Sequence, residues 1–431
     1  MKRVLIYSHD TFGLGNIRRM LEIARHLVEC DDDLSVLIIT GSPMLHAFRI
    51  PARIDYVKLP CLSRSTSGHY GSRYLDMNLQ TTVRLRAGII RSTIVDFEPN
   101  LILVDKKPFG VEEELTDALS ALPEGHARPR LVLLLRDILD SPEATTRVWQ
   151  KNRYFDAIAA HYDKVLVVGT PDVFDLRKEY AFPATAAAKV QFCGYLGRKS
   201  GRQTRAEVRS GLGLVGRQPL VLVTPGGGED GQALVQSYVE GLAALPAWKR
   251  PRSHIVFGPE MAPEQRQAIT AAAADLGSVS HQEFSDDMMS LMDAADVVVS
   301  MGGYNTVCEL LTLRKRAVVV PRVKPVLEQG IRAERMAALG LLRCVHPEQL
   351  SPSRLMATVT QEIDSLHGDG TNPNALHLDG LDGVADAIFG LIDGLQPMVE
   401  PARTPRPSRA SNRSMPTWQK CTPSVAPSAC W

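Results

Sequence analysis

Two glycine-rich turns in this chain carry the pattern of a phosphate-binding site. One turn, residues 226–228, follows a short apolar run at 220–224, and the other, residues 302–303, follows the apolar run at 297–300. A turn between a strand and a helix presents unpaired backbone N–H groups at a helix N-terminus, where the helix dipole favours an anion. Glycine also allows a ligand to approach the backbone closely. We therefore predict that both turns bind phosphate.

Polar side chains follow the second turn. Asn305 and Thr306 come directly after it, and Glu309 lies in the first turns of the helix that the apolar spacing predicts from 306 to 313. A carboxylate at this place can accept hydrogen bonds from the sugar hydroxyls of a nucleotide. A structural alternative remains, because Glu309 stands three residues after Thr306 in the spacing of a capping box. The glycine pair alone would also serve a tight turn.

A third loop follows the first predicted strand, at residues 4–7. It contains His9 and Asp10 and then the pair Gly13 and Gly15, after which helical spacing begins. A Gly-x-Gly loop between strand and helix is a ligand-binding pattern, but of low specificity when it stands alone. The loop is a candidate part of a site and needs support from the rest of the first half.

Charged residues also follow two later strands of the first half. Asp105 ends the strand at 101–104, and Arg136 and Asp137 follow the strand at 131–135. In an open α/β sheet the ligand crevice lies at the carboxyl ends of the strands, so these side chains and His9 should gather at one edge. They bind a ligand there, or they pair with one another at the sheet edge.

The order of the predicted elements indicates an α/β protein with two Rossmann-like domains. Strands and helices alternate in two consecutive series, each opening with strand, glycine loop and helix, which is typical of parallel sheets. We predict a first domain at 1–193, a linker at 194–201 and a second domain at 202–395 that ends in an amphipathic helix. Residues 396–431 are rich in Pro, Ser and Arg and have the composition of a disordered tail.

Composition excludes several classes of protein. The chain has 49 basic and 48 acidic residues, so no strong field attracts nucleic acid, and none is expected as a partner. Seven cysteines show neither a disulfide framework nor the spacing of a metal site, and we expect no metal. No apolar run approaches ~20 residues, and the N-terminus lacks the pattern of a signal peptide. We therefore expect a cytoplasmic protein.

The second half resembles the donor half of GT-B glycosyltransferases, most closely family 28. The resemblance is carried by residues 283–288, 295–300 and 302–306 together with Glu309, and it continues through Pro321 and residues 328–339. It is good over roughly 220–342 and looser over 1–190, where it concerns mainly the layout. It implies a GT-B fold, in which two Rossmann-like domains with parallel sheets face a central cleft.

The resemblance also implies a nucleotide-sugar site in the second half. The donor diphosphate would lie at the two glycine turns, the base at 284–285, the ribose at Glu309 and the transferred sugar at 328–329. The last two residues would equally suit an ordinary helix N-terminus. The implied donor-binding residues are Gly226, Gly227, Gly228, Phe284, Ser285, Gly302, Gly303, Asn305, Thr306, Glu309, Glu328 and Gln329.

The first half departs from the family pattern at one important position. Family members carry a histidine after the second glycine of the first loop, whereas this chain has Asn16, whose amide does not take up a proton. Direct displacement at the anomeric carbon requires deprotonation of the acceptor hydroxyl, worth typically ~10²–10⁴ in rate. His9 and Asp10 are the candidates for this base and Asp137 is a third, although His9 would also suit a structural role in the loop. The expected acceptor-side residues are Gly13, Gly15, Asn16, Arg136 and Asp137.

These features together predict an inverting, metal-independent glycosyltransferase without a cofactor, whose donor is a nucleoside diphosphate sugar, most readily a UDP-sugar. The acceptor stays open between a lipid-linked sugar, a polysaccharide and a small molecule. Apolar and basic residues at 83–94 also suit peripheral contact with the inner face of a membrane, or an ordinary amphipathic helix. Two alternatives remain: a nucleotide-sugar epimerase of the same fold, and a non-catalytic nucleotide-sugar-binding subunit, which Asn16 would favour.

Overall fold

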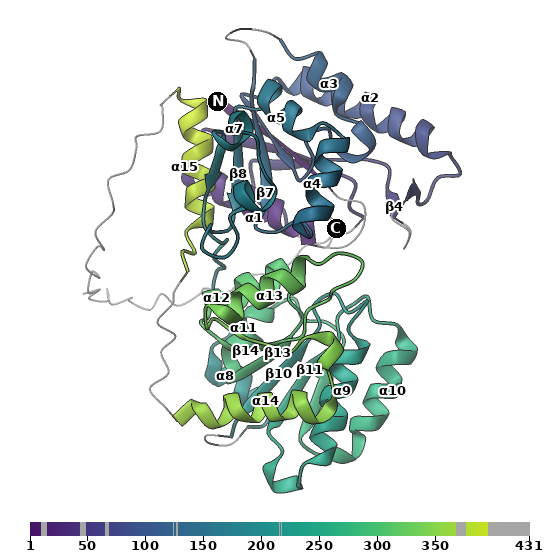
Figure 1. The fold of residues 1–431 in the computed structure, drawn as a ribbon, viewed down its shortest axis with the longest axis vertical. Coiled ribbons are helices and arrows are strands. Elements are labelled where there is room, and N and C mark those ends of the chain that lie inside the picture. Colours follow the sequence, from purple (N-terminus) through teal and green to yellow (C-terminus); the bar gives the residue numbers. More distant parts are fainter. Residues whose placement is uncertain are drawn as a thin grey trace, which may run out of the picture. The chain divides into compact units, whose positions relative to one another are not determined.

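A computed structural model describes residues 1–9, 15–43, 49–64, 69–123, 125, 128–214, 216, 218–367 and 376–394 of the chain. Of the residues predicted to act in the site, Asp10 and Gly13 lie outside these ranges, as does the predicted tail. The described residues contain two large parallel β-sheets, one in each half of the sequence, with helices between successive strands (Figure 1).

The first sheet has seven parallel strands in the order β3-β2-β1-β6-β7-β8-β9. Its central strands are buried on both faces, as their apolar sequences require. The strands are β1 (Lys2–Ser8), β2 (Leu34–Thr40), β3 (Ile54–Lys58), β6 (Leu101–Asp105), β7 (Arg130–Arg136), β8 (Lys164–Val168) and β9 (Val190–Phe192), beside a small antiparallel pair of β4 (Leu62–Arg64) and β5 (Tyr70–Ser72). The helices are α1 (Gly15–Cys30), α2 (Leu79–Phe97), α3 (Thr116–Ser120), α4 (Pro142–Lys151), α5 (Tyr154–His161), α6 (Leu176–Glu179) and α7 (Ala184–Ala187).

The second sheet has six parallel strands in the order β12-β11-β10-β13-β14-β15. These strands are β10 (Leu220–Thr224), β11 (Arg252–Val256), β12 (Val279–Gln282), β13 (Val297–Ser300), β14 (Arg316–Val319) and β15 (Arg343–Cys344). The helices are α8 (Arg205–Gly211), α9 (Gln232–Ala244), α10 (Pro263–Ala273), α11 (Met288–Ala294), α12 (Tyr304–Thr312), α13 (Glu328–Ala338), α14 (Pro352–Asp364) and α15 (Gly380–Ile392). The prediction of two Rossmann-like parallel sheets is therefore confirmed.

The strand order reverses once in each sheet. In the first sheet the reversal falls between β1 and β6, and in the second between β10 and β13. In open α/β sheets the crevice outside the carboxyl ends of the strands at this point is the usual ligand site. The glycine turn after β10 and the glycine turn after β13 thus lie where the topology itself favours binding.

The last helix, α15, belongs with the first sheet, and its predicted place in the second domain is wrong. It packs on α1 and β8, and its Val384 and Ile388 are buried in the core there (Figure 1). Two ion pairs hold its ends, with 2.9 Å from Asp382 to His26 and 2.9 Å from Asp393 to Lys2. The amphipathic pattern predicted the helix correctly but carries no information about which sheet the helix covers.

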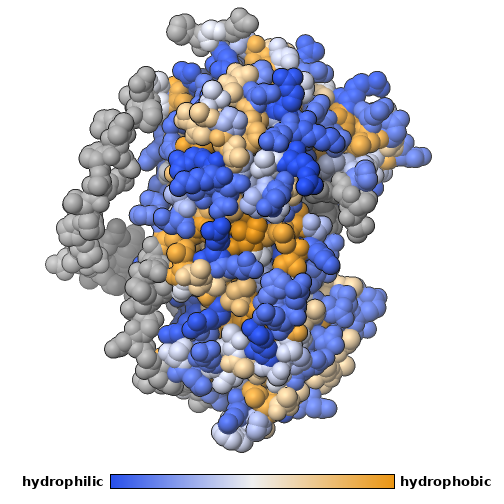
Figure 2. All heavy atoms as spheres, viewed as in Figure 1, coloured by the Kyte–Doolittle hydropathy of each residue, from blue (hydrophilic) through white to orange (hydrophobic). Residues whose placement is uncertain are grey.

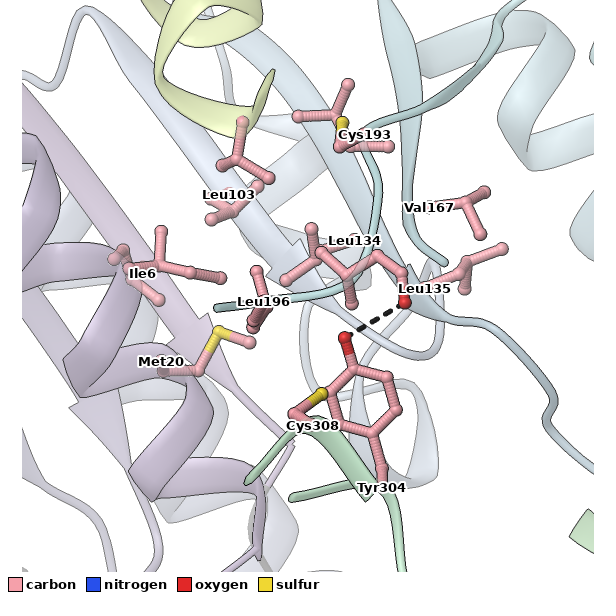
Figure 3. Packing of buried hydrophobic residues seen from close by; sticks show 14 of the residues in the cluster. Ile6, Met20, Leu103, Leu134, Leu135, Val167, Cys193, Leu196, Tyr304 and Cys308 are labelled. Carbon is pink, nitrogen blue, oxygen red and sulfur yellow. Dashed lines mark hydrogen bonds between the residues drawn. The ribbon is translucent and has the colours of Figure 1, made fainter. Parts of the chain in front are cut away.

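An aromatic side chain from the second half is inserted into the core of the first. Tyr304, the first residue of α12, is 4% exposed, and its hydroxyl donates a 3.0 Å hydrogen bond to the carbonyl of Val168 at the end of β8. Figure 3 shows Tyr304 and Cys308 packed near Met20 and Leu196. One hydrophobic cluster therefore runs from the first sheet to α12.

Inside the first half, a buried ion pair connects α2 to Glu114. Arg86 and Glu114 are both completely buried, with 2.5 Å from Nε to Oε2 and 2.7 Å from Nη2 to Oε1. The Tyr7 hydroxyl donates to Glu114 Oε1 at 2.5 Å. Burial, reinforced by the Glu114 charge, raises the pKa of Tyr7 well above its ordinary value, so this hydroxyl keeps its proton.

We predict that Glu114→Ala lowers the free energy of unfolding by about 3–5 kcal/mol, because it leaves the Arg86 guanidinium buried without a partner. The matched control is Asp156→Ala, which removes the surface pair with Arg153, where the side chains are 80% and 67% exposed. This control should cost less than about 1 kcal/mol. Urea unfolding of both variants measures the difference. Equal losses of unfolding free energy would contradict a stabilising role for the buried Arg86–Glu114 pair.

Candidate functional site

The two glycine turns of the second half begin side by side. Strands β10 and β13 pair in parallel, with Thr224 opposite Ser300 at their carboxyl ends. The turn at 226–228 and the turn at 302–303 therefore leave neighbouring strands at the same edge. The Thr306 hydroxyl lies between them, 3.9 Å from an ideal Cβ at Gly226 and 4.0 Å from one at Gly303.

The first turn has a backbone that requires glycine. Gly226 and Gly228 have φ values of +80° and +102°, in the region that other residues rarely adopt. A Cβ on Gly228 would lie 2.6 Å from the carbonyl oxygen of Phe257, and one on Gly227 would lie 2.5 Å from Glu260 Oε2. A side chain at either position would collide with neighbouring atoms, so the turn requires glycine there.

The second turn leads into a helix whose N-terminus has no side-chain cap. Gly303 is the N-cap of α12, and no side-chain hydrogen bond caps the helix there. The first N–H groups of a helix have no partner within the helix, so these groups remain available to an anion. Gly302 is buried, and its carbonyl accepts a 2.8 Å hydrogen bond from Arg332 Nη1.

Acidic side chains also stand beside the first turn. Burial, followed by the charges of Glu229 and Asp230, raises the pKa of Glu260. Asp230 is paired with Arg322 at 3.0 Å. The charge around the loop is thus partly neutralised, and attraction of an anion there depends on the backbone N–H groups and the α12 dipole.

Glu309 is buried on α12 and joins the two halves. Its side chain is 3% exposed, and Oε1 accepts a 2.6 Å hydrogen bond from Arg18 on α1. Asn305, one turn earlier on α12, donates to the carbonyl of Gly15 at 3.2 Å and accepts from Arg198 at 2.7 Å. The predicted ribose-binding carboxylate is therefore held from the first half of the chain.

The segment predicted to meet the base follows the edge strand β12. Phe284 is 55% exposed, one of the most exposed large apolar side chains in the described residues. The neighbouring Ser285 hydroxyl accepts a 3.1 Å hydrogen bond from the backbone N–H of Asp287. Because the Phe284 ring is exposed, a planar ligand can stack on it.

Glu328 and Gln329 open helix α13, next to the second turn. A Cβ on Gly302 would lie 3.2 Å from the carbonyl oxygen of Gln329. The Gln329 side chain accepts from the backbone N–H of Arg322 at 3.2 Å, and Glu328 pairs with Arg136 of the first half at 2.6 Å. The start of α13 therefore lies beside the second glycine turn, and the roles of Glu328 and Gln329 in binding a sugar remain predictions.

Asp137 is not available as a base or to an acceptor, and this part of the prediction is wrong. It is 1% exposed, and its two oxygens lie 2.7 Å from Nε and 2.7 Å from Nη2 of Arg332. The Tyr195 hydroxyl donates to it as well, at 3.0 Å. Asp137 and Arg136 also do not pair with each other, since each pairs with a residue of α13.

Two arginines of the site, Arg18 and Arg332, were not predicted from the sequence. Arg332 carries a weak local signal, because it stands four residues after Glu328 and therefore on the same helix face, 3.8 Å away. Arg18 carries none, because its partner is 291 positions distant in the sequence.

The first loop is held by a polar network that includes Asn16. The Asn16 amide donates to the carbonyl of His9 at 2.7 Å and accepts from Arg19 at 3.3 Å. Arg19 in turn pairs with Asp105 at 2.7 Å, and the His9 backbone N–H donates to Asp105 at 3.3 Å. Asn16 thus stabilises the loop, and His9, which is 3% exposed, lies at its base.

Lys106 follows Asp105 at the same edge. Its φ of +71° is unusual for a residue with a side chain. Burial, followed by the nearby Arg136 charge, lowers the pKa of Lys106 to about 8. The surroundings at this edge of the first sheet therefore disfavour the charged form of Lys106.

Comparison with known sequences gives a family match in the second half. Residues 220–375 match the model of the glycosyltransferase family 28 C-terminal domain. An uncharacterised glycosyltransferase of Methanopyrus kandleri is 34% identical over 160 residues, which is 37% of this chain and 42% of that protein. The UDP-N-acetylglucosamine–N-acetylmuramyl-(pentapeptide) pyrophosphoryl-undecaprenol N-acetylglucosamine transferase of Chromohalobacter salexigens is 30% identical over 159 residues, 37% of this chain and 43% of the relative. The alignments thus span less than half of each relative.

Solved structures match over most of the chain at low sequence identity. MurG of Acinetobacter baumannii aligns with a TM-score of 0.55 and 16% identity, covering 90% of this chain and 99% of that structure. UGT71G1 of Medicago truncatula, complexed with UDP-glucose, aligns with a TM-score of 0.58 and 11% identity, covering 91% and 98%. The chain therefore has the GT-B fold, and its residues 220–375 are similar to the C-terminal domain of glycosyltransferase family 28.

Proposed function

We propose that the chain is a glycosyltransferase that takes a sugar from a nucleoside diphosphate sugar, most readily a UDP-sugar. One observation carries this proposal: two glycine turns meet at the strand-order reversal of the second sheet, beside the uncapped N-terminus of α12 and its carboxylate Glu309. That combination suits a diphosphate followed by a ribose. The UDP donor is supported by the name of the Chromohalobacter salexigens relative, which gives that protein a UDP-N-acetylglucosamine donor.

The proposed reaction is a direct displacement with inversion. The acceptor oxygen would bond to the anomeric carbon while the bond from that carbon to the diphosphate oxygen breaks, and the acceptor proton would pass to a base. Backbone N–H groups of both turns and the α12 dipole would stabilise the departing diphosphate without a metal. His9 or Asp10 would take the proton, with His9 already placed at the first sheet's edge.

Donor binding is tested by Glu309→Ala. Each hydrogen bond to a charged group contributes about 1.5–3 kcal/mol, so loss of the ribose contacts should weaken UDP binding roughly 10–100-fold. Isothermal titration calorimetry with UDP measures the change. Glu240→Ala, on the exposed face of α9, is the control and should bind UDP like the wild type. Unchanged affinity in Glu309→Ala would refute the donor site.

For the acceptor we propose a lipid-linked sugar reached at the cytoplasmic face of a membrane. The name of the Chromohalobacter salexigens relative gives it such an acceptor. In this chain Tyr74, Leu75, Leu85 and Val95, on and just before α2, are exposed apolar side chains, and exposed arginines stand among them. Figure 2 shows hydrophobic patches within the hydrophilic surface at the upper right, where Figure 1 places α2. Among the described residues, no helix is long and apolar enough to span a bilayer.

Peripheral contact through α2 predicts that Leu85→Glu weakens binding to vesicles containing anionic phospholipid by about tenfold or more, because burying a leucine side chain contributes about 1.5–3 kcal/mol. Vesicle co-sedimentation measures this. The matched control is Val148→Glu. Val148 is also an exposed apolar residue of the first half, but it lies on α4. Equal binding by both variants would exclude α2 as the contact surface.

A further inference from the structure

We propose that Arg18 is a positioning residue of the donor site, which keeps the Glu309 carboxylate ionised and oriented so that its second oxygen can receive the ribose hydroxyls. The proposal rests on the proposed function and adds a residue from the first half to the recognition of the donor. Arg18 lies on α1 and Glu309 on α12, in different halves of the chain.

The geometry of the pair leaves room for a ligand. Arg18 Nη2 lies 2.6 Å from Glu309 Oε1, a short charge-assisted hydrogen bond. A carboxylate accepts through both oxygens, and in the described residues Oε2 of Glu309 has no hydrogen-bond partner. Arg18 thus occupies one oxygen of the carboxylate and leaves the other for a ribose.

Burial makes this arginine important for the charge of Glu309. The Glu309 side chain is 3% exposed, whereas that of Arg18 is 39% exposed. A buried carboxyl without a cationic partner tends to take up a proton, while arginine stays charged at every physiological pH. An ordinary surface ion pair would contribute little, but here the carboxylate is desolvated and depends on its partner.

The same arrangement occurs at the second donor-side carboxylate. Glu328, expected to meet the transferred sugar, pairs with Arg136 of the first half at 2.6 Å. Asn305 on α12 is likewise held by the Gly15 carbonyl and by Arg198. Three polar side chains of the donor site, Glu309, Glu328 and Asn305, are therefore held by groups from outside the donor domain, which ties donor recognition to contact between the halves.

Most other charged groups near α12 have a partner of opposite charge. From α1, Arg19 pairs with Asp105, and from α13, Arg332 pairs with Asp137. From α11, Asp293 pairs with Lys315, beyond the other end of α12. On α12 itself, burial raises the pKa of Cys308 to about 11. The remaining groups are Arg198, on Asn305, and His9, at the end of β1.

The test compares UDP binding by Arg18→Met, Arg18→Lys and the wild type at pH 8 and pH 6. Methionine keeps much of the side-chain bulk and removes the charge, whereas lysine keeps the charge. UDP's own phosphate titrates near pH ~6 with every variant, so the ratio of variant to wild-type Kd is the quantity to compare. Arg25→Met, on the same helix but away from Glu309, is the control.

We expect Arg18→Met to raise the Kd for UDP about tenfold at pH 8 and further at pH 6, since a buried carboxyl that has lost its cationic partner favours the neutral form, which a lower pH also favours. Arg18→Lys should recover most of the affinity at both pH values, and Arg25→Met should match the wild type.

Two results would overturn the inference: a Kd ratio near one at both pH values, or a raised ratio that is the same at both. Failure of the proposed function looks different, because the wild type would then bind no UDP or Glu309→Ala would bind it unchanged. Unfolding curves of Arg18→Met and Arg25→Met that coincide separate a site effect from loss of the fold.

Discussion

A completely buried guanidinium joins the two halves and fixes the second glycine turn. Arg332 is fully buried and donates two hydrogen bonds to Asp137 at the end of β7 and a third to the carbonyl of Gly302. Burial alone would lower the pKa of Arg332, but the Asp137 charge and hydrogen bonds outweigh burial and raise it. Because the arginine must keep this partner, the Gly302 carbonyl is held facing the first sheet, in a fixed position at the start of α12.

The helix that follows this turn, α12, is held at its first residue. Tyr304 is inserted into the core of the first half, stacked on Tyr195 with ring centroids 6.0 Å apart. The Arg19 and Arg332 guanidiniums lie 6.0 and 5.7 Å from the Tyr304 ring. The helix N-terminus that would bind the diphosphate is therefore rigidly placed, as electrostatic stabilisation of a leaving group by preorganised N–H groups requires.

Local patterns were enough to predict the donor side but not the contacts between the halves. The apolar runs at β10 and β13 and the glycines after them specify strand, turn and helix within a few residues, so the parallel sheets and the two turns could be predicted. The pairs Arg18–Glu309 and Arg332–Asp137 join residues about 200 to 300 positions apart. No periodicity encodes such a contact, which is why Asp137 was assigned to chemistry and α15 to the wrong sheet. Asn16 could be excluded as a base from its chemistry alone, whereas its bond to the His9 carbonyl required the structure.

We propose that a nucleoside diphosphate binds where the two turns of the second half meet. A crystal structure of the chain with UDP is the sharpest test of this site. We expect phosphate oxygens within hydrogen-bond distance of backbone N–H groups at residues 226–228 and 303–306, with the ribose hydroxyls on Glu309. UDP bound instead at the strand-order reversal of the first sheet, between β1 and β6, with the turns of the second sheet empty, would contradict it.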